Sequence, residues 1–214
     1  MKTNITLLSS LFALFLVGFS FSAKAQTQVT TADSVCAGTQ DVVYGIASVP
    51  AASSLQWWLD DPTAGTIDLG ISSNDDQIQI DWGTTSGTYS LYAVETTEFG
   101  CLGDTMELSI TINDLPSALV VSDSVCEGFD PTLTFTVTGE FPVTIDFTDG
   151  TSNYQTVASS SPHTYTITGA GYTTSQTIDI TSVVDDNTCS EVTPVTGVNV
   201  TIHPAASTGQ IYHY

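Results

Sequence analysis

Apolar and polar side chains alternate with a period of two along much of this chain. In the second half, polar residues separate the apolar side chains of Leu133, Phe135, Val137, Val143, Ile145 and Phe147. In the first half the same alternation involves Leu55, Trp57, Leu59, Ile78, Ile80, Leu108, Ile110 and Ile112. Such alternation places every second side chain on one face of a β-strand. These segments therefore predict short strands that each bury one face.

The breaks between the runs favour an antiparallel arrangement of these strands. Gly, Pro, Asn and Asp interrupt the runs at short intervals, and helical spacing is not sustained in any of them. Thr, Val, Ile, Tyr and Ser, which suit strands, are frequent. We therefore predict an all-β chain that is built from antiparallel β-sandwiches.

Four cysteines divide the chain into two similar units. The segment Asp33-Ser34-Val35-Cys36 recurs word for word at residues 123–126, 90 positions later. Each unit has a second cysteine 65 or 63 residues after the first, at Cys101 and Cys189. The repeat therefore predicts two tandem sandwiches of roughly 90 residues each, about the size of a seven-stranded immunoglobulin-like domain. We expect domains at residues 26–115 and 116–204, followed by a tail at residues 205–214.

Because each unit has one cysteine near its start and one near its end, we predict disulfides from Cys36 to Cys101 and from Cys126 to Cys189. In the chain-entropy description, closing each loop stabilises its unit by roughly 4 kcal/mol. Trp57 would lie against the first bridge, as the buried tryptophan of an immunoglobulin-like sandwich does. A redox or metal role is disfavoured because the sequence has no CxxC motif and no cluster of Cys with His.

A signal-like leader occupies residues 1–25. Residues 5–21 are almost all apolar or small, and Ala23-Lys24-Ala25 has the small-x-small pattern of a cleavage site. An uncleaved membrane anchor is the alternative, but the apolar run is short and the cleavage pattern follows it directly. We expect a signal peptide, no membrane span, and export to the periplasm, the outer-membrane surface or the extracellular space, where disulfides persist.

Cleavage would leave a chain without a single Lys or Arg. The two basic residues are Lys2 and Lys24, so the net charge of −21 would become −23 once both are removed. Phosphate clamps, Schiff-base lysines and nucleic-acid contacts all need the missing cations. We therefore expect no nucleic-acid partner and no organic cofactor, and we expect salt or divalent cations to stabilise the chain.

Both units contain short motifs around their turns and cysteines. In the first unit these are Cys36-Ala37-Gly38, Ile78-x-Ile80-x-Trp82-Gly83, Gly87-x-Tyr89-x-Leu91 and Phe99-Gly100-Cys101. In the second unit they are Phe147-Thr148-Asp149-Gly150-Thr151, Pro162-His163-Thr164-Tyr165 and Cys189. These motifs resemble the PKD-like and immunoglobulin-like repeats on the surface of gliding bacteria with type IX secretion. The resemblance covers residues 30–204 and implies tandem PKD-like sandwiches that serve as spacers, adhesion units or binding platforms.

This resemblance implies a non-enzymatic structural or adhesive module of the cell envelope or surface. It further implies an accessory subunit for gliding motility or type IX export, with an envelope or surface protein as partner. The aromatic tail residues Tyr212, His213 and Tyr214 are candidates for docking on that neighbour. A frayed chain end is the alternative interpretation.

Two alternative functions follow from particular side chains. A carbohydrate-binding protein would need Trp58 and Trp82 exposed on one face, where a sugar ring could stack. A small secreted hydrolase would need His163, His203 or His213 beside a nucleophile, but no serine stands in a G-x-S-x-G sequence.

Calcium is a weak candidate ligand of paired acidic residues. These pairs are Asp60-Asp61, Asp75-Asp76 and Asp185-Asp186. Carboxylate oxygens suit Ca²⁺, but the chain has no loop of the D-x-D-x-D-G type. We therefore assign no metal ligands and expect these acids to be solvated loop residues.

Overall fold

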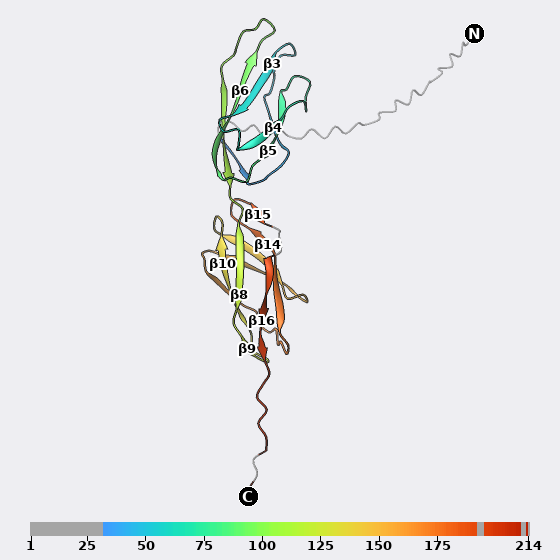
Figure 1. Cartoon of the computed structure of the whole chain (residues 1–214), viewed down its shortest axis with the longest axis vertical. Coiled ribbons are helices and arrows are strands. Elements are labelled where there is room, and N and C mark those ends of the chain that lie inside the picture. Colours follow the sequence, from blue (N-terminus) through green and yellow to red (C-terminus); the bar gives the residue numbers. More distant parts are fainter. Residues whose placement is uncertain (1–31, 192–194, 211–212, 214) are drawn as a thin grey trace, which may run out of the picture.

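The computed structural model describes residues 32–191, 195–210 and 213 of the chain. Within these residues every regular element is a β-strand, which confirms the predicted all-β fold class. Figure 1 shows the strands in two lobes that follow one another along the longest axis. The predicted leader, and the tail residues Tyr212 and Tyr214, lie outside the described residues.

The N-terminal lobe (residues 32–113) consists of two facing sheets. One sheet has the strand order β1-β7-β6-β3, and the other has the order β2-β5-β4. All pairings are antiparallel except that of β1 with β7. The strands are β1 (Ala32–Cys36), β2 (Val42–Gly45), β3 (Ser54–Leu59), β4 (Gly65–Asp68), β5 (Gln77–Trp82), β6 (Gly87–Thr96) and β7 (Met106–Asn113).

The C-terminal lobe (residues 117–203) has the same two-layered plan. A sheet of order β13-β10-β8 faces one of order β12-β11-β14-β15, in which β16 also pairs with β14, and β9 pairs with β17. The strands are β8 (Ser117–Ser122), β9 (Val125–Cys126), β10 (Thr132–Thr138), β11 (Val143–Thr148), β12 (Asn153–Ala158), β13 (His163–Thr166), β14 (Gln176–Val184), β15 (Ser190–Glu191), β16 (Val195–Val200) and β17 (Ile202–His203).

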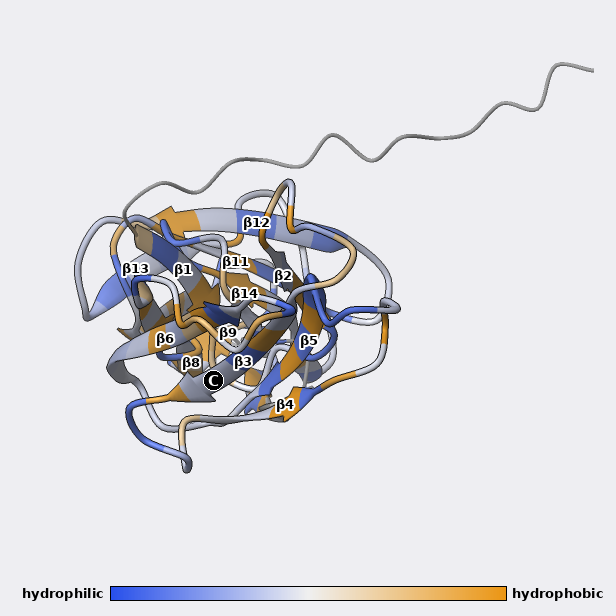
Figure 2. Cartoon of the chain, turned by 90° about the horizontal axis from the view of Figure 1, so that it is seen from above, coloured by the Kyte–Doolittle hydropathy of each residue, from blue (hydrophilic) through white to orange (hydrophobic). Residues whose placement is uncertain are grey.

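Each lobe buries its own apolar core between its two sheets. In the C-terminal lobe the core includes the predicted inward residues Leu133, Phe135, Val137, Val143, Ile145 and Phe147. In the N-terminal lobe it includes the predicted Leu59, Ile78, Ile80, Ile110 and Ile112. The view down the long axis in Figure 2 shows much of the hydrophobic colour on strand segments at the centre. The period-two pattern therefore identified the buried faces correctly.

A linker of three residues joins the lobes, because β7 ends at Asn113 and β8 begins at Ser117. Each strand pairing within the described residues joins two strands of the same lobe. The lobes are also joined covalently by a disulfide between Cys36 and Cys189, with a Cα–Cα distance of 5.4 Å. The linker and the disulfide therefore both connect the lobes covalently at the same joint.

The predicted disulfide pairing within each unit is wrong in this structure. Cys101 and Cys126 are exposed and unpaired. In the N-terminal lobe, Cys36 lies beside Asn113, at the end of β7, whereas Cys101 precedes the start of β7 at Met106. The eight residues of β7 span roughly 24 Å at about 3.4 Å per residue, and two Cα atoms more than about 7 Å apart cannot be bridged.

The same geometry separates the two cysteines of the C-terminal lobe. Cys189 follows the end of β14, whereas β9 with Cys126 pairs with β17, which follows β16 at the opposite end of β14. The nine residues of β14 span roughly 27 Å at about 3.4 Å per residue. Spacing in the sequence showed that each unit has two cysteines, but not that they lie at opposite ends of a sandwich.

Candidate functional site

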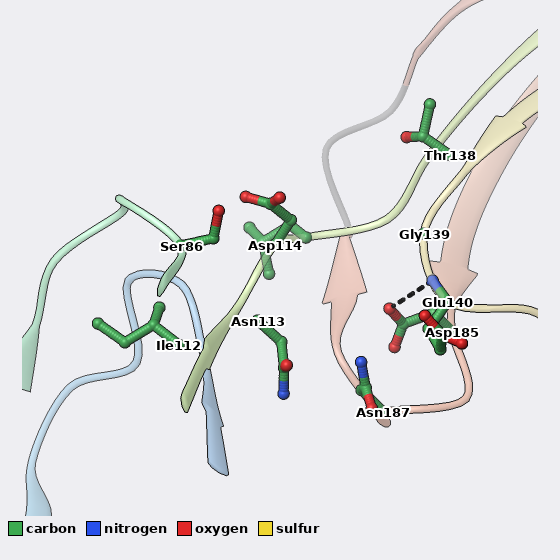
Figure 3. Close-up of a pocket in the computed structure, with 10 residues that line it drawn as sticks. Ser86, Ile112, Asn113, Asp114, Thr138, Gly139, Glu140, Asp185 and Asn187 are labelled. Carbon is green, nitrogen blue, oxygen red and sulfur yellow. Dashed lines mark hydrogen bonds between the residues drawn. The ribbon is translucent and has the colours of Figure 1, made fainter. Parts of the chain in front are cut away.

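The joint between the lobes contains an open, polar cleft of about 530 Å³. The N-terminal lobe and the linker contribute Ser86, Ile112, Asn113, Asp114 and Leu115, and the C-terminal lobe contributes Thr138, Gly139, Glu140, Asp185 and Asn187. Figure 3 shows side chains from both lobes around this cleft. The cleft is therefore a product of the way the lobes meet.

Asp185 organises the C-terminal side of the joint. Its side chain is buried, its Oδ1 accepts a hydrogen bond of 3.0 Å from the backbone N–H of Cys189, and its Oδ2 accepts one of 3.3 Å from that of Glu140. Figure 3 shows the second of these bonds. The carboxylate thus fixes the turn that carries the bridging cysteine. Both oxygens of Asp185 are thus engaged with backbone N–H groups of the C-terminal lobe.

Gly139 allows the linker to approach the C-terminal lobe closely. Its backbone has a φ of +129°, and a Cβ atom at this position would lie 2.9 Å from Pro116 Cβ and 3.3 Å from Asp185 Cβ. Side chains are strongly disfavoured there both by backbone conformation and by space. The linker, the Asp185 turn and the disulfide therefore meet in one closely packed region.

The cleft is lined by carboxylates, amides and the hydroxyl residues Ser86 and Thr138. The histidines of the hydrolase hypothesis, His163, His203 and His213, are not among the residues that line it. The ring of His163, on β13, is hydrogen bonded through Nε2 to Thr156 Oγ1 at 2.7 Å. The part of the chain that the structure describes has no group of three or more His, Cys, Asp or Glu residues that could hold a metal ion.

The remaining acidic pairs also stabilise turns. Asp61 Oδ1 accepts hydrogen bonds from the Thr63 hydroxyl and backbone N–H, which lower the pKa of the Asp61 carboxyl. Asp75 Oδ1 accepts a 3.1 Å hydrogen bond from the backbone N–H of Gly70. These two acids lie in loops, as expected, but the expectation that every paired acid is solvated is wrong for Asp185, which is buried.

The two tryptophans of the carbohydrate hypothesis lie in different environments. Trp58, on β3, is 38% exposed and stacks on Tyr92 of β6, with ring centroids 5.4 Å apart. Trp82, at the end of β5, is only 1% exposed and packs edge-on against Tyr44 in the core. The prediction that Trp82 could bind a ligand is therefore wrong. The alternation of Ile78 and Ile80 with polar residues continues to Trp82, and this continuation was the signal for its burial.

The prediction that Trp57 lies against a bridge from Cys36 to Cys101 is wrong, because Cys36 is bonded to Cys189. Its side chain is partly buried against the core of the N-terminal lobe, and its Nε1–H donates a 2.8 Å hydrogen bond to the Asp75 carbonyl. Its role is thus structural.

In the tail, residues 205–210 and His213 are exposed.

Asp149, in the motif Phe147-Thr148-Asp149-Gly150-Thr151, is the buried centre of a polar cluster. Its Oδ1 accepts hydrogen bonds from the backbone N–H groups of Thr151 and Ser152, and its Oδ2 accepts them from the hydroxyls of Tyr154 and Tyr172. Burial by itself would raise the pKa of Asp149, but these hydrogen bonds together lower it to about 2. The motif is therefore a structural turn with an ionised carboxylate.

Residues 22–104 match the sequence model of the PKD-like domain family. The match covers most of the first predicted unit, residues 26–115, whereas the resemblance noted in the sequence extended over both units. No curated protein sequence matches the chain. Among the described residues no helix is long and apolar enough to cross a membrane.

Several solved structures resemble the chain at low sequence identity. The eight N-terminal Ig domains of Down Syndrome Cell Adhesion Molecule match at 12% identity and a TM-score of 0.51, over 82% of this chain and 24% of that chain. The fibronectin(III)-like modules of Clostridium thermocellum CbhA match at 16% identity and a TM-score of 0.39, over 87% and 97% of the two chains. The D00-D0 domain of intimin matches at 14% identity and a TM-score of 0.40, over 82% and 96%. The first of these matches supports the immunoglobulin-like sandwich fold.

Proposed function

We propose that this chain is a non-enzymatic, exported structural and adhesive module of the bacterial cell envelope or surface. The observation that carries the proposal is the disulfide between Cys36 and Cys189, which ties one lobe to the next at the joint. A bond at this position opposes separation of the lobes under load, whereas a bond inside a single sandwich would leave the joint held by the linker alone. Covalent closure of a joint suits a spacer that transmits force.

The surface chemistry supports the same role. Without residues 1–25 the chain would have no Lys or Arg and a net charge of −23. Such a surface is repelled by anionic lipids and nucleic acids and favours cation-bridged or basic protein partners. Within this function we propose that residues 26–115 and 116–204 are two domains, and that the protein is an accessory subunit for gliding motility or type IX export.

A genetic experiment in the source bacterium tests this function. Deletion of the gene should reduce attachment or colony spreading on agar, and the wild-type gene should restore it. The matched variants are Cys36→Ser, which removes the joint bond, and Ser34→Ala, a change on the same strand that leaves the bond intact. We expect Cys36→Ser to restore the phenotype poorly although immunolabelling detects the protein on intact cells. Full attachment and spreading without the gene would contradict the proposal.

A carbohydrate-binding role has one favourable observation, the exposed Trp58 stacked on Tyr92. Stacked aromatic rings present a flat apolar face on which a sugar ring can pack. A glycan array with the wild-type chain and Trp58→Ala tests it. Binding that depends on Trp58 would favour this second candidate over a purely structural role.

A further inference from the structure

The turn that carries Cys126 has the same structure as the turn that carries Cys36. In each case the cysteine ends a strand that pairs in parallel with the last strand of its lobe, beside Asn113 and His203 respectively. The backbone N–H of the next residue donates a 2.8 Å hydrogen bond to that partner's carbonyl in both lobes. A glycine with positive φ follows in both, at Gly38 and Gly128. Cys126 is therefore the structural counterpart of Cys36.

The turn that carries Cys101 is likewise the counterpart of the turn that carries Cys189. Each cysteine lies five residues after the end of a long strand, β6 or β14. Its carbonyl accepts a hydrogen bond from the backbone N–H of Thr97 or Asp185, at 2.9 and 3.1 Å. The side chain of that same residue accepts a hydrogen bond from the cysteine N–H, at 3.1 and 3.0 Å. The two turns thus present their cysteines in the same way.

Each lobe therefore has one cysteine at the end of its first parallel-paired strand and one in a turn after a long strand, and the two lie at opposite ends of the lobe. The joint of this molecule connects the strand-end cysteine Cys36 of the N-terminal lobe to the turn cysteine Cys189 of the C-terminal lobe. The two counterparts, Cys126 and Cys101, are both exposed and unpaired. In Figure 1, β6 runs toward the end of the N-terminal lobe far from the joint, and β9 lies at the opposite end of the molecule. Each end of the molecule therefore presents one unpaired cysteine that corresponds to one of the two cysteines of the joint.

Exposed apolar side chains accompany both free cysteines. Phe99 and Leu102, which flank Cys101, are 84% and 73% exposed, and Phe129, three residues after Cys126, is 67% exposed. At the closed joint, the positions that correspond to Phe99 and Phe129 are the polar residues Asn187 and Thr39. Large apolar side chains that gather at a surface mark sites of contact. Both ends thus have apolar surface that an end-to-end contact would cover.

We propose that Cys126 of one molecule forms a disulfide with Cys101 of a second copy of this chain, so that copies join head to tail. The new joint would repeat the one between Cys36 and Cys189. Because the two contacting surfaces differ and lie at opposite ends of an elongated molecule, each added copy leaves one free surface at each end, and the contact extends into a linear polymer. This proposal rests on the structural function proposed above and deepens it, because it names a second copy of the chain as the partner at each end of the molecule.

Bond formation needs a disulfide oxidant, such as oxidised glutathione or a dithiol-disulfide oxidoreductase. The Cys126 thiolate attacks one oxidant sulfur, forms a mixed disulfide and releases one thiol. The Cys101 thiolate of the next copy then attacks Cys126 Sγ, forms the intermolecular bond and releases the second thiol. In total, two protein thiols and one oxidant disulfide yield one protein disulfide and two small thiols.

Acidic residues at the two ends oppose this contact electrostatically. They are Glu98 and Asp104 near Cys101, and Asp123, Glu127 and Asp130 near Cys126. The closed joint has a similar set, with Asp114, Glu140 and Asp185 around its cleft. Repulsion between exposed like charges weakens as salt is added, so we expect polymer formation to increase with ionic strength.

The test uses the exported chain and two single variants, Cys101→Ser and Cys126→Ser, incubated with oxidised glutathione in 0.5 M salt. Products are separated on non-reducing gels and by size-exclusion chromatography. The wild-type chain should give a ladder of polymers, and each variant alone should stay monomeric. An equimolar mixture of the two variants should give a dimer and no larger species. Mass spectrometry of the dimer should identify a peptide that links Cys126 to Cys101.

Several outcomes would overturn this assembly. If each variant alone dimerises as readily as the mixture, the thiols react without the proposed geometry. A wild-type chain that stays monomeric would also contradict it. So would linked peptides that join Cys36 to Cys101 and Cys126 to Cys189. If the wild-type protein stays monomeric and deletion of its gene still abolishes attachment, the assembly is contradicted and the proposed structural function is not.

Discussion

Replacement of Asp149 by Asn should destabilise the C-terminal lobe in a manner that depends on pH. The amide oxygen can still accept the hydrogen bonds of Thr151 and Ser152, but the amide nitrogen would face the hydroxyls of Tyr154 and Tyr172, which now donate to the carboxylate. The variant therefore loses a charge-assisted cluster and little volume. The substitution therefore measures how much the negative charge of Asp149 contributes to the stability of the C-terminal lobe.

The magnitude follows from the pKa of Asp149, which is lowered from 3.8 to about 2. At about 1.36 kcal/mol per pKa unit, this difference corresponds to a stabilisation of at most about 2.4 kcal/mol. Tyr154 and Tyr172, which donate to the buried carboxylate, are themselves only partly buried, so solvent screening weakens these interactions and we expect roughly 1–2 kcal/mol. The stabilisation should be complete above about pH 4, the unfolded value, and should disappear as the pH falls through about 2, the folded value.

The assay is urea unfolding at a series of pH values, followed by two signals. All three tryptophans, Trp57, Trp58 and Trp82, belong to the N-terminal lobe, so tryptophan fluorescence reports that lobe, and far-UV circular dichroism reports both. We expect Asp149→Asn to lower only the unfolding transition of the C-terminal lobe at pH 7. The difference between wild type and variant should vanish near pH 2.

Asp146→Asn is the matched control, because it removes one charge from the same lobe at a residue whose side chain accepts a hydrogen bond from the exposed Gln155. Changes at such a surface site are usually within about 0.5 kcal/mol. The reasoning is refuted if both variants lower the stability equally at pH 7. A loss for Asp149→Asn that is the same at pH 7 and pH 2 would refute it as well, because the effect would then not come from the carboxylate charge.

Three further predictions concern the core, the joint and the charge. Trp82→Ala should cost the N-terminal lobe about 3–5 kcal/mol in urea unfolding, whereas Trp58→Ala, at an exposed position, should cost less than about 1 kcal/mol. Gly139→Ala should lower the melting temperature more than Gly150→Ala, because both have positive φ but only Gly139 would contact Pro116; equal losses would contradict this. Added sodium chloride should raise the melting temperature of the chain without residues 1–25, because salt screens repulsion between its acidic residues. A melting temperature that does not change with added salt would contradict this.

Much of the N-terminal lobe could be predicted because its information is local. The alternation at Ile78 and Ile80 reports which face of β5 is buried, and the structure buries both completely. The same rule extended by two residues also accounts for Trp82, which a functional interpretation of exposed tryptophans placed on the surface. The period of a strand is a property of a few neighbouring residues, so it can be read without knowledge of the rest of the chain.

The candidate site could be predicted less well because it depends on residues that are distant in sequence. Asp185 contacts the backbone of Glu140, 45 residues away, and no pattern in either segment indicates this. The close approach of Gly139 to Pro116 likewise arises only when the linker folds back onto the lobe. Turn residues such as the Asp149-Gly150 pair were identifiable, but their hydrogen-bond partners were not.

By itself the amino-acid sequence determined that the chain is all-β, which faces of its strands are buried, and that it contains a repeat with two cysteines in each unit. Only the tertiary structure decided which cysteines meet. The strands of a sandwich carry the two cysteines of one unit to opposite ends, and stacking of the lobes brings Cys36 within bonding distance of Cys189. The alternation of buried and exposed side chains is fixed by the local geometry of a strand. Cysteine pairing depends instead on the distance between two cysteines, which the whole fold sets.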